Sequence, residues 1–186
     1  MKKVILFSVF FLPATLVISG QVYFTKNGKI NFNATSKDSP EKIEAVNRTV
    51  TCVLDTKTGN LQFSVPMKGF EFERAAMQEH FNDDYVESSK FQKSEFKGVL
   101  VNNSEVKYAV NGSYTVKVNG KLTLHGVTKD VQAEGKLIVS GGKLNAMADF
   151  NVLLADYDIS IPGLVADKVS KTAIISVSCS LELFKG

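Results

Sequence analysis

The chain has 186 residues, of which 44% are hydrophobic and 22% charged, and its formal net charge is +3. That length fits one domain with a sizeable hydrophobic core. The 22 basic residues are scattered along the sequence and form no stripe, so charge and composition do not indicate a nucleic-acid-binding protein.

Residues 1–20 have the pattern of a secretory signal peptide. A positively charged start, MKK, precedes an apolar core, VILFSVFFLPATLVI, and the small Gly20 lies just before the expected cleavage point at Gln21. Polar sequence follows at once without a stop-transfer pattern, which argues against a transmembrane anchor. We therefore expect residues 21–186 to form the mature domain of a periplasmic or secreted protein.

Apolar and polar residues alternate through most of the mature part, as in strands that bury one face. Residues 55–59 separate two alternating runs and are typical of a hairpin turn, and residues 140–142 separate another such pair. Pro66 is expected near the end of its strand, because proline cannot donate a ladder hydrogen bond. The expected strands of the first half are residues 28–34, 45–55 and 60–68.

The second half continues the same pattern. One long alternating run covers residues 106–126 and puts Val110 and Tyr114 on one face. Within it, the pair Asn119-Gly120 is either a tight turn or a bulge in a longer bent strand. The other expected strands are residues 94–101, the two arms of a hairpin within residues 129–154, and residues 172–184.

Eight or nine antiparallel strands with one short helix predict an all-β fold, either a sandwich or a closed barrel of about eight strands. The inward rows mix small residues with phenylalanine and leucine, which would leave room inside a barrel for one slender ligand. The alternation alone does not distinguish an open interior from a filled one. The small inward residues are Ala133, Gly135, Ala146 and Ala148.

The stretch RAAMQEHFNDDYVESSKF, residues 74–91, departs from the alternation. Its first residues are good helix formers, and Met77 and Phe81, four positions apart, would form the apolar face of a two-turn helix. Residues 82–84, Asn-Asp-Asp, are typical of a helix stop. We interpret this segment as a lid whose apolar face seals one end of the barrel.

His80 gives the same stretch a second interpretation, because Asp83, Asp84 and Glu87 follow it closely. A zinc or nickel site usually needs three or more convergent ligands, commonly with a second histidine, and the spacing here offers no such set. We therefore expect no metal and no catalytic residue, and we keep a metal-binding protein or enzyme that uses this acidic cluster as an alternative. The sequence contains no nucleophile elbow, phosphate loop or CxxC motif.

Three further residues have more than one interpretation. His125 lies in LTLHGVTKDV, where Gly126 is expected to take a special dihedral angle in a turn, and its ring is either structural or in contact with a ligand. Cys52 and Cys179 both fall on the apolar side of their strands. They are either a disulfide of an exported protein or two small buried apolar residues.

Five segments follow one another in a recognisable order: GKINFNA, LDTKTGNLQFSVPMKGFEFE, MQEHFNDDYVESSKFQKSEFKG, GKLTLHGVTKDV, and DYDISIPGLVADKV with ISVSCSLE. Together they resemble the YceI-like family, also called polyisoprenoid-binding, in the version found in Bacteroidetes-type bacteria. The resemblance covers essentially the whole mature chain. It implies an exported, extended, lipocalin-like antiparallel β-barrel whose apolar interior holds an isoprenoid chain, such as a polyprenyl phosphate or a quinone tail. It implies no catalytic residue and no other cofactor.

The resemblance and the alternation together predict a protein that sequesters or carries an isoprenoid lipid and is not an enzyme. Burial of a long apolar chain is favourable by about 25 cal/mol per Å² of apolar area. The alternative is a barrel filled by its own side chains that acts as a structural or stress-related interaction protein, and a homodimer is left open. The residues expected to line or close the interior are Phe63, Phe70, Phe72, Met77, Phe81, Phe96, Tyr114, Leu124 and Phe150.

Overall fold

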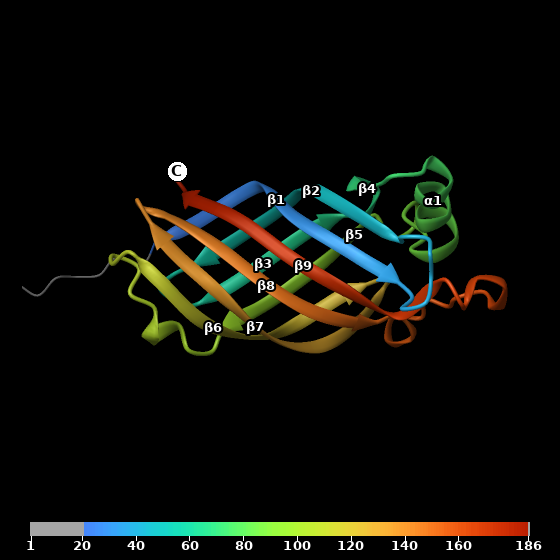
Figure 1. Ribbon diagram of the computed structural model, residues 1–186. Helices are drawn as coiled ribbons and strands as arrows, with labels where there is room; N and C mark the ends of the chain where they lie inside the picture. Colours follow the sequence, from blue (N-terminus) through green and yellow to red (C-terminus); the bar gives the residue numbers. More distant parts are fainter. Residues whose placement is uncertain (1–20, 186) are drawn as a thin grey trace, which may run out of the picture.

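The computed structural model describes residues 21–185, so the expected signal peptide lies outside the described part of the chain. The described residues form an antiparallel β-barrel with one short helix, α1, beside one end (Figure 1). Eight strands close the barrel, which confirms the predicted all-β fold. The strands are β1 (Val22–Thr35), β2 (Glu44–Asp55), β3 (Asn60–Pro66), β4 (Phe70–Phe72), β5 (Lys93–Leu100), β6 (Gly112–Leu124), β7 (Val127–Ser140), β8 (Lys143–Leu153) and β9 (Val169–Leu183).

The strands follow the order β1-β9-β8-β7-β6-β5-β3-β2 around the barrel, and β1 pairs with β2 to close the ring. The short β4 pairs with the half of β2 that β3 does not reach. Closure removes the two outer edges that an open sheet of this size would expose to other chains. Neighbouring strands in space are mostly neighbours in sequence, so hairpins build most of the wall.

The turns predicted from glycine positions are present. Gly59 has a φ of 75° in the turn between β2 and β3. Gly141 and Gly142, with φ of 57° and 77°, form the turn between β7 and β8. These angles lie in the left-handed region that glycine adopts without steric strain, which is why the sequence signal was reliable here.

The long run of residues 106–126 contains one strand, β6, which begins only at Gly112. β6 pairs with β7 without interruption as far as Leu124, so Asn119-Gly120 forms neither a turn nor a bulge. Val110 precedes the strand, and 52% of its surface is exposed, so the expectation that it shares one face of a strand with Tyr114 is wrong. A hydrogen-bonded turn closes at Val110 before the extended backbone begins.

α1 spans Ala75–His80, and one π-helical turn, η2 (Phe81–Tyr85), extends it. The predicted stop at residues 82–84 is therefore wrong. The side-chain amide of Asn82 donates a hydrogen bond to the Gln78 carbonyl at 2.8 Å, one turn back along the helix. A residue that usually ends helices thus supports the continuation of this one.

The remaining helical elements are short. η4 (Leu154–Tyr157) follows β8 and buries both of its end residues, and η5 (Gly163–Val165) lies in the loop before β9. Within residues 21–185, no helix is long and apolar enough to cross a membrane. The other two short turns are η1 (Met67–Gly69) and η3 (Asn103–Glu105).

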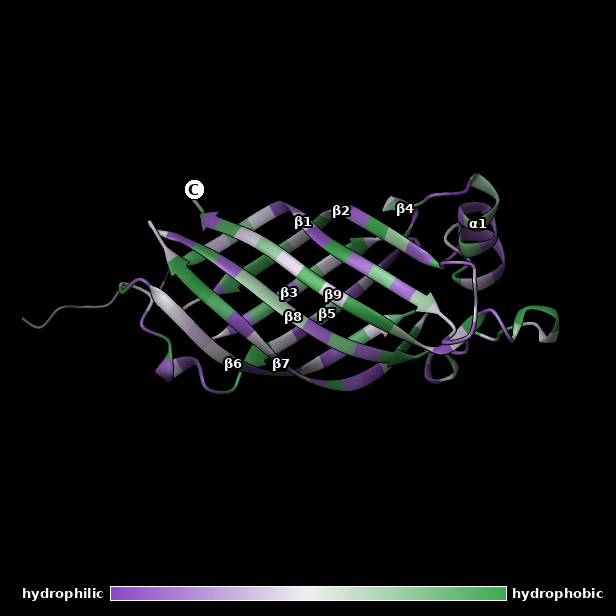
Figure 2. Cartoon of the chain, viewed as in Figure 1, coloured by the Kyte–Doolittle hydropathy of each residue, from purple (hydrophilic) through white to green (hydrophobic). Residues whose placement is uncertain are grey.

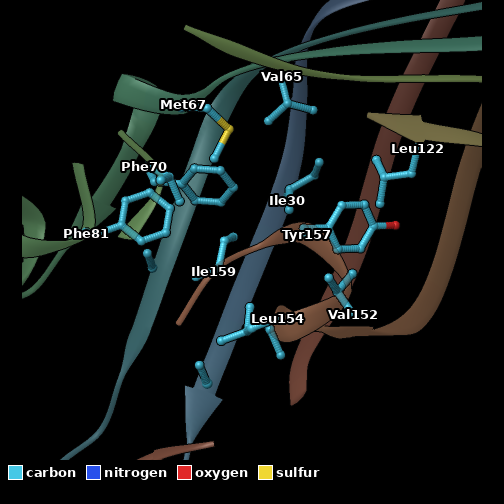
Figure 3. Packing of buried hydrophobic residues seen from close by; sticks show 14 of the residues in the cluster. Ile30, Val65, Met67, Phe70, Phe81, Leu122, Val152, Leu154, Tyr157 and Ile159 are labelled. Carbon is cyan, nitrogen blue, oxygen red and sulfur yellow. The ribbon is translucent and has the colours of Figure 1, made fainter. Parts of the chain in front are cut away.

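Hydrophobic and hydrophilic residues alternate along the barrel strands (Figure 2), and the inward residues divide into two buried clusters. The first cluster lies toward α1 and includes Phe70, Phe81 and Tyr157 (Figure 3). The second cluster fills the opposite half. It contains Tyr23, Cys52, Leu54, Leu61, Leu100, Val106, Val116, Leu137, Val139, Leu144, Cys179 and Leu181.

Cys52 and Cys179 are both free, buried thiols within the second cluster. This is the second of the two interpretations that the sequence left open, namely two small buried apolar residues.

Candidate functional site

A cavity of about 620 Å³ occupies the half of the barrel toward α1. Its volume lies within the range of about 300–1,000 Å³ that is usual for small-molecule sites. All the strands except β2 contribute residues to its wall, together with α1, η2 and the loops beside them. The wall is mainly aliphatic and aromatic, so the space suits a long apolar molecule better than a polar one.

The cavity accounts for most of the residues that the sequence predicted as lining. Their inward position follows from the alternation of each strand, or from the apolar face of the helical segment. Eight of the nine line this space, namely Phe63, Phe70, Phe72, Met77, Phe81, Phe96, Leu124 and Phe150.

Tyr114, the ninth, is not among the residues that line the cavity. It pairs with Leu137 in the β6–β7 ladder and packs against the second cluster, in the half of the barrel away from α1. Its hydroxyl donates toward the Val110 carbonyl at 3.0 Å, in the loop before β6. The alternation correctly placed Tyr114 on the inner side, but it could not show which half of a long strand faces open space.

Phe81 lines the cavity at the end nearest the helix. Its ring lies 5.6 Å from the ring of Phe32, 5.5 Å from that of Phe70 and 5.0 Å from that of Phe72, measured between ring centroids. Tilted and edge-on aromatic pairs at such distances are favourable beyond the area they bury. The aromatic group joins η2 to β1 and β4, so the helical segment is held on the barrel by packing, as the lid interpretation expects.

The other end of the cavity is closed by packed side chains. Leu61, Val116 and Ala146 line its inner limit, and the second cluster lies beyond them. In that cluster Leu144 and Leu181 are 0% exposed, and Leu137 is 2% exposed. The cavity is therefore a cup with one closed end.

Two glycines keep the middle of the cup wide. Gly98 and Gly120 face each other in the β5–β6 ladder. A Cβ atom would lie 2.6 Å from the Phe96 ring at Gly98 and 2.5 Å from it at Gly120. Because these side chains are absent, the ring can lie along the wall instead of standing out into the space.

Charged residues gather where the cavity meets solvent beside α1. Glu41 forms ion pairs with Arg74 and with Lys168, whose ammonium nitrogen lies 3.6 Å from the carboxylate. His80 lies 2.7 Å from the Asp84 carboxylate. All five residues line the cavity, so an apolar interior ends in a polar rim that carries both signs of charge.

The four residues of the alternative metal site do not converge. His80 pairs with Asp84, whereas Glu87 contacts His125 instead. Within residues 21–185, no group of three or more His, Cys, Asp and Glu side chains is placed to hold a metal ion. We therefore do not pursue a metal-based function for this cluster.

His125 ties three segments together. Its Nδ1 lies 3.0 Å from the Tyr157 carbonyl, and its Nε2 lies 2.9 Å from the Glu87 carboxylate. Both ring nitrogens are thus engaged, one by a backbone carbonyl and the other by a carboxylate. His125, Glu87 and Asp158 are the three non-glycine residues with positive φ among residues 21–185, and Asp158 directly follows Tyr157.

The ring of His125 is further held by Phe91, whose centroid lies 4.6 Å away. The predicted turn at this position is confirmed, since Gly126 has a φ of 77°. His125 does not line the cavity, so its role here is structural.

Comparison with known protein families shows to which family the chain belongs. A model of the YceI-like domain matches residues 15–181. The chain belongs to the YceI-like family. Among proteins with curated descriptions, none matches it in sequence.

Solved structures share the YceI-like fold at low sequence identity. A polyisoprenoid binding domain from Saccharophagus degradans implicated in plant cell wall breakdown has a TM-score of 0.76 at 15% identity, over 89% of this chain and 100% of its own. BcnA of Burkholderia cenocepacia has a TM-score of 0.64 at 14% identity, over 83% and 95% of the two chains. The Campylobacter jejuni YceI protein has a TM-score of 0.51 at 16% identity, over 100% of both.

Sequence reasoning missed several residues of this YceI-like cavity. Ile30 and Phe32 were recognisable, because they alternate on the inward face of β1. Glu41 and Lys168 lie in loops that are far apart in the sequence, and no local pattern signals that the fold brings them together. The same holds for the contact between Glu87 and His125.

Proposed function

We propose that this YceI-like protein binds a long isoprenoid chain, of the polyprenyl phosphate or quinone type, and sequesters or carries it. The observation that carries the proposal is the cup of about 620 Å³, apolar along its wall, closed at one end and polar at the rim beside α1. Each methylene moved from water into such a space is worth about 0.8 kcal/mol. The proposed function is binding alone, with no catalytic step.

The open cup favours this function over a filled barrel. A structural barrel would occupy its interior with its own side chains, as the second cluster does in the half away from α1. In the other half, Ala133, Gly135 and Ala148 are small where larger side chains would close the space. The description of the Saccharophagus degradans domain as polyisoprenoid binding supports the same class of ligand.

The rim supports a ligand with an anionic head. Arg74 and Lys168 both face Glu41, so two cations share one carboxylate. A phosphate placed between them would gain charge-assisted hydrogen bonds, which are stronger than neutral ones. We therefore favour a polyprenyl phosphate over a quinone as the ligand.

Export is part of the proposal and rests on the pattern of residues 1–20. In the periplasm or outside the cell, an isoprenoid released from a membrane would need a protein to shield it from water. A second copy of the chain is not required, because one barrel contains the whole cup.

Extraction of bound lipid tests the proposal. The protein is expressed with its own leader, purified without detergent and analysed by native mass spectrometry, followed by organic extraction. We expect a prenyl lipid to be released, or a dansyl-labelled farnesyl probe to bind the purified protein. Absence of both a released lipid and probe binding would reject the function.

A matched pair of variants locates the binding. Ala146→Phe fills the closed end of the cup, whereas Asn145→Phe places the same ring on the neighbouring position of β8, which does not line the cavity. We expect the first to weaken probe binding by about tenfold or more, because it removes apolar space, and the second to leave binding unchanged.

A further inference from the structure

The ladder between β7 and β8 covers only part of the two strands. It runs from Ser140 paired with Lys143 to Gly135 paired with Ala148. Beyond that point, residues 127–134 of β7 pair only with β6, and residues 149–153 of β8 pair only with β9. Both strands can be followed in Figure 1; toward α1, β7 joins β6 through a tight turn, whereas β8 continues into η4.

The separation of β7 from β8 is local, because the segments adjoining the two strands come into contact again beyond it. Continuing the register of the ladder would place Tyr157 opposite Gly126. At that point the neighbouring His125 contacts the Tyr157 carbonyl, 3.0 Å from its Nδ1, and the Tyr157 side chain is buried. The wall is thus closed on both sides of an unpaired stretch, which we call the side window.

The ladder between β5 and β6 is also incomplete, but there side-chain hydrogen bonds close the gap. β6 extends beyond β5, and there the side chain of Asn102 takes over the missing pairing. Its Oδ1 accepts from the Lys117 N–H at 2.9 Å, and its amide donates to the Thr115 carbonyl at 3.0 Å. In the described part of the chain, no hydrogen bond of this kind joins residues 127–134 to residues 149–153.

The cavity reaches the side window. Ala133 and Phe150 line it from the two unpaired stretches. Glu134, which is exposed on the outer face and lies one residue past the last ladder pair, also lines the cavity. Lys136 and Met147 line it as well, and they pair with each other at the border of the window. An exposed residue that borders the cavity at the first unpaired position marks where the interior approaches the outer face.

The window also carries the charges that protect an unpaired strand. Lys129, Asp130 and Glu134 are exposed along the free stretch of β7. Charged side chains on a free strand edge oppose pairing with the edge of another molecule. The gap can therefore persist in a soluble barrel without causing edge-to-edge association.

We propose that the side window is the passage through which the apolar chain enters and leaves the cup, an inference that rests on the proposed function. At the end beside α1, Phe81 packs against three aromatic rings and ion pairs hold the rim, so this opening is framed by groups that are fixed in place. The window offers a second route, flanked by Ala133, Gly135 and Ala148, whose side chains are too small to block it. A chain passes there without displacement of the helix.

Site-specific blocking tests the proposal. A single cysteine replaces Glu134 at the window, Leu164 at the rim beside α1, or Lys97 on the outer wall, where β5 is paired on both sides. Each is coupled to the same polyethylene glycol maleimide. The native thiols are 0% and 1% exposed, so the reagent reaches only the new one. Stopped-flow fluorescence then measures association and release of the dansyl-labelled farnesyl probe.

We expect the adduct on Glu134→Cys to slow association and release by the same factor, about tenfold or more, because blocking a passage changes rates and not the equilibrium. The Lys97→Cys adduct should leave both rates unchanged. Unchanged rates with the Glu134→Cys adduct, together with slow rates for Leu164→Cys, would overturn the window and leave the proposed function intact. Failure of the unmodified protein to bind the probe would overturn both.

A variant without any adduct provides an independent test of the side window. His125→Ala removes the tie that closes the window next to Tyr157. We expect faster association and release with little change in their ratio, measured on protein whose circular dichroism matches wild type. Rates equal to those of the wild type in this folded variant would contradict a passage that ends at His125.

Discussion

The Sγ atom of Cys179 lies 2.5 Å from the position that a Cβ atom on Gly28 would occupy. β1 shifts register at this point against both β2 and β9, which marks a bulge. The missing side chain lets the thiols of Cys52 and Cys179 interact across β1. A hydrogen bond with Cys179, together with burial, raises the pKa of the Cys52 thiol well above its ordinary value, so Cys52 stays protonated.

Gly28→Ala should therefore destabilise the barrel through overpacking. We expect a loss of about 1–3 kcal/mol in the free energy of unfolding, measured by urea denaturation. Gly163→Ala is the matched control, because a Cβ atom at that position would have no other atom within 4 Å. Adding Cys179→Ala to Gly28→Ala should recover part of the loss, since it removes the clashing sulfur. Strictly additive effects of the two changes would argue against this contact.

Tyr108 should make stability depend on pH in the alkaline range. Burial raises the pKa of Tyr108 to about 12, and its hydroxyl lies 2.6 Å from the Asn103 side-chain oxygen. Because the folded state keeps this proton longer than the unfolded state, the associated stability is present below pH of about 10 and falls as pH approaches 12. Tyr108→Phe should flatten the decline of stability over this interval, measured by denaturation at each pH. An equally steep decline in the variant would show that other groups cause it.

The rim should distinguish ligands by their head. Arg74→Gln and Lys168→Gln each remove one of the cations that face Glu41. We expect about a tenfold weaker affinity for farnesyl phosphate in the double variant, with the affinity for farnesol unchanged, because only the phosphate forms charge-assisted bonds. Isothermal titration with both compounds checks this. Equal losses for both ligands would mean that the rim shapes the cup and does not bind the head.

Phe81 should be the residue on which docking of the helix depends. It is 8% exposed and contacts the rings of Phe32, Phe70 and Phe72. Phe81→Ala should lower the free energy of unfolding by about 3–5 kcal/mol, because it leaves a void among packed rings. Phe184→Ala is the control, since that side chain is 57% exposed. A loss below about 1 kcal/mol in Phe81→Ala would mean that the helical segment contributes little to the barrel.

The fold was largely readable from the sequence, because a strand with one buried face must alternate. Leu61, Phe63 and Val65 are inward on β3 for this reason, and all three line the cavity. The predicted helix stop was wrong because Asn82 bonds to Gln78 rather than to a turn. Helix propensity describes the average behaviour of a residue type, and here one side-chain hydrogen bond was enough to let the helical segment continue through Asn82.

The cavity was predictable in composition but not in extent. Alternation identified Phe63 and Phe150 as inward, and small residues such as Ala148 indicated space. It could not place Tyr114 beyond the closed end, because a strand keeps the same pattern in an open half and in a packed half. The partial pairing of β7 with β8 could not be predicted from the sequence either. Alternation indicates which face of a strand is buried, but it does not indicate which neighbouring strand forms the hydrogen bonds.

The packing of the barrel is uneven along its axis. In the half away from α1, Leu144 and Leu181 face each other in the β8–β9 ladder and are fully buried, whereas Val152 and Ala173 of the same two strands line the cup. Side chains beside an empty space lack partner atoms on one side, so this half should open locally at a lower free energy. We expect faster amide exchange around Val152 than around Leu144 in the empty protein, and a bound chain should slow only the former. Ligand binding would then change the local fluctuations of this half of the barrel and leave its overall structure unchanged.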